Sequence, residues 1–187
     1  MRRPTLVSLA AAIALATSTA PSLAASAGTE GPWYADRLTE IGFRVLASPA
    51  SVPDFEVEAL AGGAIKLSDF KGKIVLLNFW ATWCPPCKEE LPSIQALWQR
   101  TKDKPFALVA VSQGESRQKV LSFIEKNKYV LPVYIDPAGK SGALYGARSI
   151  PTTCVIGKDG RLIAYTVGGL RYDRPEVLSL FAELADR

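Results

Sequence analysis

The sequence predicts an α/β fold in which a central mixed β-sheet is flanked by helices on both faces. First, the run Ile74–Trp80 is apolar except for Asn78, which is typical of a strand buried on both faces. Second, strand-like and helical segments alternate after it, which favours parallel strands with helical crossovers. Third, two late strands flank the turn Asp159-Gly160 and a helix follows them, so an antiparallel hairpin completes the sheet.

The N-terminus has the layout of a secretory signal peptide. Arg2 and Arg3 precede the apolar stretch Leu6–Ala16, and small residues suited to cleavage follow at positions 22–27. The apolar stretch is short for a membrane span, yet retention as an uncleaved anchor stays an alternative. No cysteine lies near the stretch, which argues against a lipoprotein anchor. We therefore predict a signal peptide at residues 1–27 and an exported bacterial protein that works in the periplasm or elsewhere outside the cytoplasm.

The rest of the chain divides into an N-terminal extension, residues 28–51, and one domain, residues 52–187, which is long enough for a proper core. Apolar residues at helical spacing within Trp33–Leu46 predict a short amphipathic helix in the extension. Phe55–Ala59 and Ile65–Leu67 alternate apolar and polar residues around two glycines, a pattern that predicts an N-terminal β-hairpin.

The later elements follow from the same two periodicities. An apolar stripe every three or four positions predicts a helix, and a short apolar run between turn residues predicts a strand. An aspartate cap and a proline in the first turn mark the start of the last helix at Asp173–Glu176. The other predicted elements are a helix from Cys84 to about Lys102, a strand at Phe106–Val111, a helix at Val120–Tyr129, a strand at Leu131–Ile135, a short helix at Ser141–Tyr145, and strands at Thr152–Ile156 and Leu162–Val167.

The charge balance excludes a strongly basic or acidic protein. The chain carries 22 lysines and arginines against 18 acidic residues, a formal net charge of +4. Both arginines of the leader are included, so a cleaved chain carries +2. This charge is too mild to indicate nucleic acid or an anionic surface as a partner, and the scattered charges indicate a solvated surface.

Cys84 and Cys87 form a Cys-x-x-Cys pair shortly after the predicted strand Ile74–Trp80. Two cysteines at this spacing close a disulfide only where the backbone turns at once, and the first turn of a helix places both on one face. The unpaired N–H groups and the helix dipole at that end favour a thiolate on Cys84. The pattern therefore predicts a redox-active dithiol with Cys84 as the nucleophile.

Two other uses of the pair stay open from the residues alone. A zinc site needs four ligands, whereas the chain has no histidine and only one further cysteine, Cys154, so zinc is disfavoured. A structural disulfide suits an exported protein, but a bond across two intervening residues closes so short a loop that it constrains the unfolded chain little. No metal site is predicted.

The segment Leu76–Pro92 (LLNFWATWCPPCKEELP), followed far downstream by Ser149–Thr153 (SIPTT), resembles the TlpA/ResA branch of the thioredoxin superfamily. The resemblance extends over roughly residues 52–186 and implies a thioredoxin fold of the redoxin (AhpC/TSA-like) kind. It implies an extracytoplasmic thiol:disulfide oxidoreductase, usually a reductant of protein disulfides, and some members serve cytochrome c maturation. It also implies disulfide-containing client proteins, a membrane thiol reductase as the electron donor and no cofactor, with membrane attachment only if the leader is retained.

The resemblance assigns roles around the cysteines. Cys84 attacks a substrate disulfide and forms a mixed disulfide, which Cys87 resolves from one helical turn deeper. Pro85 and Pro86 fix φ between the two sulfurs and remove backbone donors, so they take part in setting the reduction potential. Trp83 adjoins the nucleophile and is expected to shield it on one side.

Ile150 and Pro151 match the family's substrate-binding segment. Pro151 corresponds to a cis-proline beside the dithiol, although cis X-Pro bonds are otherwise a small minority. The backbone of Ile150 is expected to pair with an extended client segment, so that recognition is a form of β-augmentation.

Three further residues receive expectations. By resemblance, Glu90 is a partly buried acid whose raised pKa lets it exchange a proton with Cys87, whereas the alternative is a solvated helix acid beside Glu89. Asn78 stands where thioredoxin has a buried acid, a departure that makes Glu90 more important. Cys154 lies on a predicted strand and is expected to be a small buried core residue.

Other function classes fit the residues less well. A thiol peroxidase-like redoxin needs a hydroxyl side chain three residues before its cysteine and a proline seven before, and here Ala81 and Leu77 stand there. A disulfide-introducing oxidase of the DsbA kind usually has a histidine between the cysteines, and copper delivery depends on histidine and methionine, of which only Met1 is present. A redox-inactive thioredoxin-fold binding module stays an alternative, although such a protein is expected to lose a cysteine or Pro151.

Overall fold

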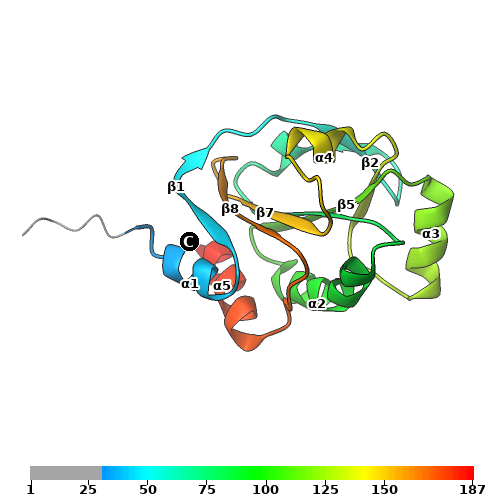
Figure 1. Cartoon of the computed structure of the whole chain (residues 1–187). Helices are drawn as coiled ribbons and strands as arrows, with labels where there is room; N and C mark the ends of the chain where they lie inside the picture. Colours follow the sequence, from blue (N-terminus) through cyan, green and yellow to red (C-terminus); the bar gives the residue numbers. More distant parts are fainter. Residues whose placement is uncertain (1–30) are drawn as a thin grey trace, which may run out of the picture.

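The computed structural model describes residues 31–187, so the predicted signal peptide lies outside the described residues. The strands, in chain order, are β1 (Arg44–Ala50), β2 (Glu56–Ala59), β3 (Ala64–Lys66), β4 (Ile74–Trp80), β5 (Phe106–Gln113), β6 (Val133–Asp136), β7 (Thr152–Ile156) and β8 (Leu162–Val167). In this part of the chain they form one mixed sheet in the order β1-β8-β7-β4-β5-β6-β2-β3 (Figure 1). Strands β4, β5 and β6 are parallel neighbours, and the other pairs are antiparallel.

Helices cover both faces of the sheet, as predicted, but unequally. The helices are α1 (Ala35–Glu40), α2 (Pro85–Thr101), α3 (Arg117–Lys126), α4 (Lys140–Leu144) and α5 (Pro175–Asp186), with a 3₁₀ turn η1 (Leu67–Phe70). The buried apolar residues of α1, α2, α3 and α5 all belong to one core, and Figure 1 shows α4 on the opposite side of the sheet from α2 and α5. Within residues 31–187, no helix combines the length and apolarity that a membrane crossing requires.

Strand β4 lies between β7 and β5, and all of its residues are buried. The even-numbered apolar residues from Ile74 to Trp80 join the core beneath α2, whereas the odd-numbered residues from Val75 to Phe79 join the core on the other face. Asn78 shares the face of Trp80 by this alternation and is therefore directed toward α2. Because β4 leads into α2 through residues 81–84, its register decides where the cysteines lie.

The predicted helix over Trp33–Leu46 is wrong in its second half. Helix α1 ends at Glu40, and β1 begins at Arg44 and pairs antiparallel with β8 at the edge of the sheet. Gly42 has φ +106°, a conformation that ends the helix and that glycine adopts readily. Pro49 is tolerated in β1 because an edge strand does not need all of its N–H groups. The extension and the following domain therefore share one sheet.

The remaining predicted elements are confirmed, with shifted ends. The hairpin β2–β3 forms one edge of the sheet and also pairs with β6. Helix α3 ends at Lys126, before Lys128 at φ 56°. The cap of α5 is Arg174, not the predicted Asp173, whose carboxylate instead lies 2.8 Å from the Arg171 guanidinium.

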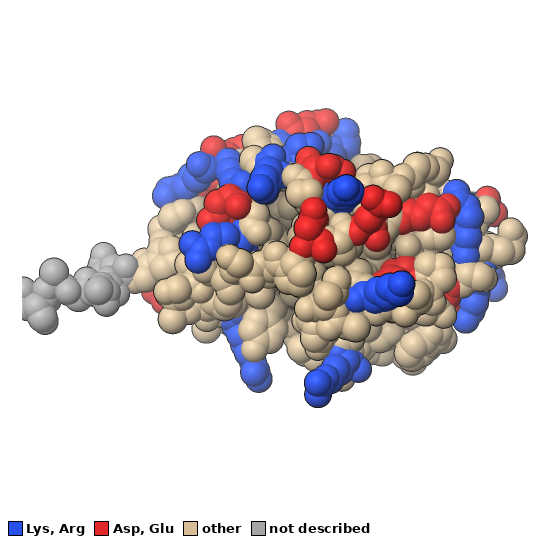
Figure 2. Space-filling view, turned by 90° about the horizontal axis from the view of Figure 1, so that it is seen from above, with Lys and Arg blue, Asp and Glu red and all other residues tan. Residues whose placement is uncertain are grey.

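Charged side chains are spread over the surface. On the face shown in Figure 2, acidic and basic side chains are interspersed. Some of them form exposed ion pairs between distant elements, such as Lys104 with Asp186. This distribution agrees with the predicted solvated surface.

Candidate active site

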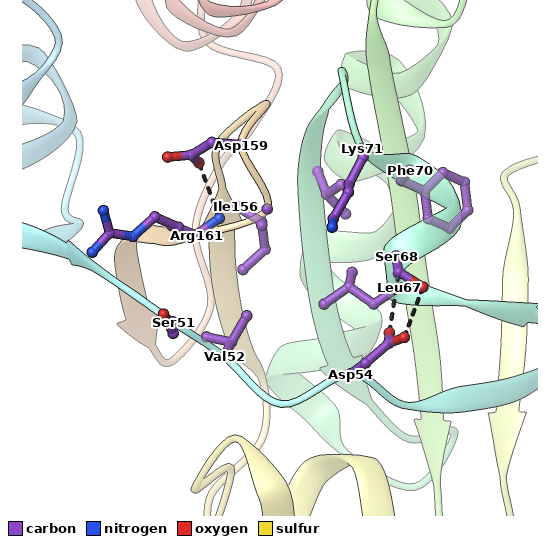
Figure 3. A pocket seen from close by; sticks show the side chains of 13 residues that line it. Ser51, Val52, Asp54, Leu67, Ser68, Phe70, Lys71, Ile156, Asp159 and Arg161 are labelled. Atoms are coloured by element: carbon purple, nitrogen blue, oxygen red, sulfur yellow. Dashed lines mark hydrogen bonds between the residues drawn. The ribbon is translucent and has the colours of Figure 1, made fainter.

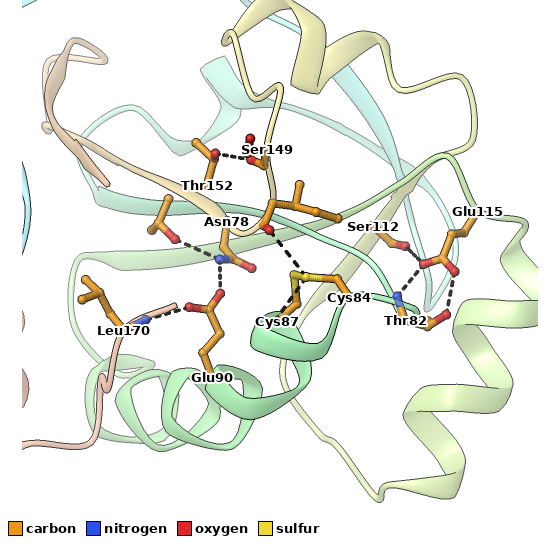
Figure 4. The surroundings of a disulfide bond; sticks show 12 residues. Asn78, Thr82, Cys84, Cys87, Glu90, Ser112, Glu115, Ser149, Thr152 and Leu170 are labelled. Atoms are coloured by element: carbon orange, nitrogen blue, oxygen red, sulfur yellow. Dashed lines mark hydrogen bonds between the residues drawn. A yellow bond between two sulfur atoms is a disulfide. The ribbon is translucent and has the colours of Figure 1, made fainter. Parts of the chain in front are cut away.

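Cys84 and Cys87 form a disulfide at the start of α2 (Figure 4). Cys84 is the N-cap residue with extended backbone, Cys87 lies in the first turn, and their Cα atoms are 5.3 Å apart. The backbone N–H of Cys87 donates to the Cys84 Sγ atom at 3.3 Å. After reduction, this donor and the helix dipole stabilise a thiolate on Cys84.

The two prolines occupy the first two positions of α2, where a helix has unpaired N–H groups. Proline has no N–H, so Cys87 supplies the first backbone donor that the N-cap sulfur can use. The removed donors make the Cys84 thiolate less stable than at an ordinary helix start. A less stable thiolate makes the reduced form less stable, so we expect Pro85 and Pro86 to make the dithiol a stronger reductant.

We expect Pro86→Ala to lower the pKa of the Cys84 thiol, because it adds a second N–H donor at the position from which caps receive hydrogen bonds. The disulfide becomes easier to reduce, and a tenfold change in the equilibrium constant against dithiothreitol corresponds to about 30 mV. The measurement is the thiolate absorbance of the reduced protein against pH, together with the redox equilibrium. Pro105→Ala, an exposed proline outside the site, serves as the control. An unchanged or higher thiol pKa in Pro86→Ala contradicts the argument.

Both cysteines are almost completely buried, but Cys84 is slightly more exposed than Cys87. Cys87 is fully buried and Cys84 is 2% exposed, so Cys84 is the outer sulfur, as predicted for the nucleophile. The preceding residue, Trp83, is 61% exposed and stands on the surface beside them. The outer sulfur is therefore only slightly accessible, and the side chain directly before it in the sequence, Trp83, is exposed.

The predicted substrate-binding segment lies against the outer sulfur. The Ile150–Pro151 peptide bond is cis, and the Ile150 carbonyl oxygen is 3.6 Å from the Cys84 Sγ atom. Strand β7 begins directly after Pro151 and pairs with β4, the strand that leads to the cysteines. The sheet register thus brings together two segments that are far apart in the sequence.

Glu90 is buried one turn after Cys87, at 2% exposure, which excludes the alternative of a solvated acid. Its carboxylate accepts hydrogen bonds from the Asn78 side-chain amide at 2.9 Å and from the Leu170 backbone N–H at 3.1 Å (Figure 4). Burial raises the pKa of Glu90 to about 7, and the two hydrogen bonds limit the rise. Glu90 can therefore gain or lose a proton near neutral pH.

A buried polar network continues behind Glu90. The Asn78 amide also donates to the Thr153 hydroxyl at 2.9 Å, which receives a further hydrogen bond from the Tyr172 phenol at 3.0 Å. Burial raises the pKa of Tyr172 far above its ordinary value, so the phenol keeps its proton. The sequence analysis missed Thr153 and Tyr172, and its only signal for this network is Asn78 inside an apolar strand.

Glu115 is a second acid that the sequence analysis missed. It precedes α3, at the C-terminal side of β5, is 4% exposed, and its carboxylate contacts Thr82 in the segment before Cys84 (Figure 4). A polar residue just after a buried strand of a parallel pair was the available signal, because such strand ends meet at the edge where α/β proteins place their sites.

The structure also shows where the third cysteine, Cys154, lies and bears on the metal-site alternative. Cys154 is buried on β7 opposite Leu77 and belongs to the core on the far side of the sheet from α2, as predicted for a core residue. Burial raises the pKa of its thiol to about 12. In residues 31–187 no cluster of three histidine, cysteine or acidic side chains has a geometry that could hold a metal ion.

A cavity of about 300 Å³, whose lining residues are drawn in Figure 3, includes neither cysteine of the dithiol. The cavity lies at the start of β4 and the end of β7. The cysteines lie at the opposite edge of the sheet, beyond the end of β4 and near the start of β7. The Ser68 hydroxyl donates to the Asp54 carboxylate at 2.7 Å. Lys71, Asp159 and Arg161 also line the cavity. The cavity is therefore not part of the candidate active site.

Comparisons with known proteins agree on one family. The model of the AhpC/TSA family matches residues 50–165. The thiol-disulfide oxidoreductase ResA of Bacillus thuringiensis subsp. konkukian is 40% identical over 111 residues, which cover 59% of this chain and 64% of that protein. The chain thus matches somewhat less than two thirds of the length of this curated relative.

Two solved structures extend the comparison. The pneumococcal exposed lipoprotein thioredoxin Etrx1 from Streptococcus pneumoniae matches with a TM-score of 0.61 and 34% identity, over 70% of this chain and 99% of that chain. A secreted thiol-disulfide isomerase from Corynebacterium glutamicum matches with a TM-score of 0.68 and 27% identity, over 78% of this chain and 92% of that chain.

Proposed function

Because this chain belongs to the AhpC/TSA family, we propose that it is an exported thiol:disulfide oxidoreductase that reduces disulfides of client proteins through Cys84 and Cys87. Its fold is the thioredoxin fold that the resemblance implied. The observation that carries the proposal is the disulfide at a helix N-terminus with the cis peptide segment 3.6 Å from its outer sulfur.

In the proposed reaction the reduced protein supplies two electrons. The Cys84 thiolate attacks one sulfur of a client disulfide, and the other client sulfur leaves as a thiolate. Cys87 then loses its proton and attacks Cys84 in the mixed disulfide, which releases the second client thiolate and forms the Cys84–Cys87 disulfide. The client disulfide becomes two thiols, and the dithiol of this chain becomes a disulfide.

Glu90 is the proposed acceptor of the Cys87 proton. It lies one turn from Cys87, and with a pKa of about 7 it is ionised in about half of the molecules at neutral pH. Asn78 on β4 and the Leu170 N–H after β8 donate to the ionised carboxylate and hold it on the side of α2 that faces the sheet. A base with a pKa near the working pH combines a sufficient ionised fraction with sufficient basicity.

Client recognition is proposed at Ile150 and Trp83. The Ile150 segment precedes β7 and lies beside the reacting sulfur, so an extended client strand bound there brings its own sulfur close to Cys84. The exposed Trp83 ring offers an apolar surface next to the nucleophile.

The place of action is proposed to be outside the cytoplasm. The leader supports export, and the similar structures include a secreted isomerase and an exposed lipoprotein. We extend the proposal to a membrane thiol reductase as the electron donor and to cytochrome c precursors as a client class, because the resemblance to the TlpA/ResA branch implies both.

The proposal is tested by two measurements on the purified protein. We expect the Cys84–Cys87 pair to equilibrate with dithiothreitol at a potential near that of thioredoxin, about −270 mV, and to catalyse insulin reduction. A potential near that of DsbA, about −120 mV, reverses the proposed direction of electron flow. A pair that does not exchange with external thiols refutes the function and leaves a structural disulfide.

A further inference from the structure

Glu115 binds the segment before the nucleophile with both of its carboxylate oxygens. The Oε2 atom accepts from the Thr82 backbone N–H at 2.7 Å and from the Ser112 hydroxyl at 2.9 Å. The Oε1 atom accepts from the Thr82 hydroxyl at 2.6 Å and from the Lys119 ammonium at 2.8 Å. We call Glu115, Thr82, Ser112 and Lys119 the Glu115 clasp.

The carboxylate at the centre of the Glu115 clasp is buried and ionised. The Glu115 side chain is 1% exposed, whereas Lys119 is 55% exposed and covers the carboxylate from the solvent side. Burial opposes ionisation, but the hydrogen bonds from Lys119, Thr82 and Ser112 outweigh it and lower the pKa of Glu115 below its ordinary value. At neutral pH the clasp therefore keeps its charge and all four donors.

The residues that the clasp holds are those that meet a client. Thr82 stands two positions before Cys84, and the Cys84 N–H bonds back to the Ala81 carbonyl at 3.2 Å, so residues 81–84 form one tight turn. Trp83, inside this turn, is 61% exposed and has little packing of its own to fix it. The bonds to Glu115 restrain the turn from the side of α3.

We propose that Glu115 is a positioning residue of the dithiol site: acting through Thr82, it fixes the turn that presents Trp83 and Cys84 to the client. This inference rests on the proposed function for its biological use, but the geometry that it describes is separable from turnover. The substrate class is the same, a protein disulfide, and Glu115 itself touches neither client nor sulfur.

A purely structural role is the competing explanation, because the bonds to Ser112 and Lys119 tie β5 to α3 whatever happens at Thr82. Substitutions at Thr82 distinguish the positioning role from the purely structural one. Thr82→Val removes the hydroxyl bond and leaves the charge, the backbone bond and the ties to α3 in place. Thr82→Ser keeps the hydroxyl.

The test compares Thr82→Val with Thr82→Ser, with Glu125→Gln, an exposed acid on α3, as the control. We expect Thr82→Val to lower kcat/KM for insulin roughly three- to tenfold, mainly through KM, since a hydrogen bond to a charged group is lost. The reduced variant should also be alkylated by iodoacetamide at Cys84 more slowly at pH 7, because a mobile N-cap stabilises the thiolate less. Thr82→Ser should restore both values, and Glu125→Gln should leave them unchanged.

Glu115→Gln adds a stronger perturbation and is expected to raise KM further. If this variant does not fold, the Thr82 pair decides alone. Equal KM and equal alkylation rates in Thr82→Val and the wild type overturn the inference. A wild type that is alkylated at Cys84 but never reduces insulin refutes the proposed function instead, and the alkylation rates of the two Thr82 variants then still test the clasp.

Discussion

Cys84→Ser is expected to abolish disulfide reduction, with a loss of turnover of roughly 10³-fold or more. A serine hydroxyl stays protonated at the helix N-terminus, whereas the cysteine thiol there is stabilised as a thiolate by the Cys87 N–H. Without the outer sulfur no mixed disulfide can form, and Cys87 is fully buried and cannot replace it. The measurement is insulin reduction with dithiothreitol as the electron source.

Cys87→Ser is the informative partner of this variant. It keeps the attacking thiolate and removes only the resolving step, so we expect a mixed disulfide between Cys84 and the client to accumulate. Mass spectrometry under non-reducing conditions detects the adduct, and addition of dithiothreitol should release it. Cys154→Ser should retain full activity, because this thiol is buried on the other face of the sheet. Unchanged turnover in Cys84→Ser, or an adduct on Cys154, contradicts the proposed mechanism.

Glu90→Gln is expected to slow turnover roughly 100-fold at pH 7.5, because a positioned base typically contributes between 10²- and 10⁴-fold. In the wild type the rate of client release should rise as the pH passes through about 7, since the ionised carboxylate accepts the Cys87 proton. The variant should lose this inflection. Glu89→Gln, the exposed neighbour on the same helix, provides the matched control.

The same carboxyl predicts a stability change with a fixed sign. The folded protein retains the Glu90 proton up to a pH of about 7, whereas the ordinary pKa of 4.5 applies in the unfolded chain. The folded state therefore binds more protons between these values, and the free energy of unfolding decreases as the pH rises from 4.5 to 7. At about 1.4 kcal/mol per pKa unit, the ionisation of Glu90 lowers the free energy of unfolding by about 3 kcal/mol.

Urea unfolding at pH 5 and pH 8 checks this sign in the wild type, Glu90→Gln and Glu89→Gln. The unfolding free energy of the wild type minus that of Glu90→Gln should fall from pH 5 to pH 8, because only the wild type ionises a buried carboxyl in this range. Glu89→Gln should follow the wild type at both values, because its side chain is exposed. A rise in this signed value with pH requires a Glu90 pKa below the ordinary value and rules out its role as a neutral-pH base.

The dithiol site was predictable because its main signals are local. A continuous apolar strand, a cysteine at the following N-cap and two prolines in the first turn are neighbours in the chain, and each has one dominant conformation. The resemblance then added Pro151 and Glu90, which backbone periodicity alone does not connect to Cys84. In the structure the Ile150–Pro151 bond is cis and the buried Glu90 carboxylate accepts from Asn78, whereas the roles of both residues in the reaction stay predictions.

Local patterns in the sequence are enough to specify the strand–dithiol–helix unit and the order of the elements, because periodicity and capping act over a few residues. Long-range packing sets three further features: residues 44–50 form an edge strand on β8, Thr153 and Tyr172 support Asn78, and Glu115 binds Thr82. These contacts join residues that are distant in sequence and depend on which strands become neighbours and in which register. No local pattern encodes that choice, since it follows from burying the apolar faces of all the elements in one sheet with a shared core.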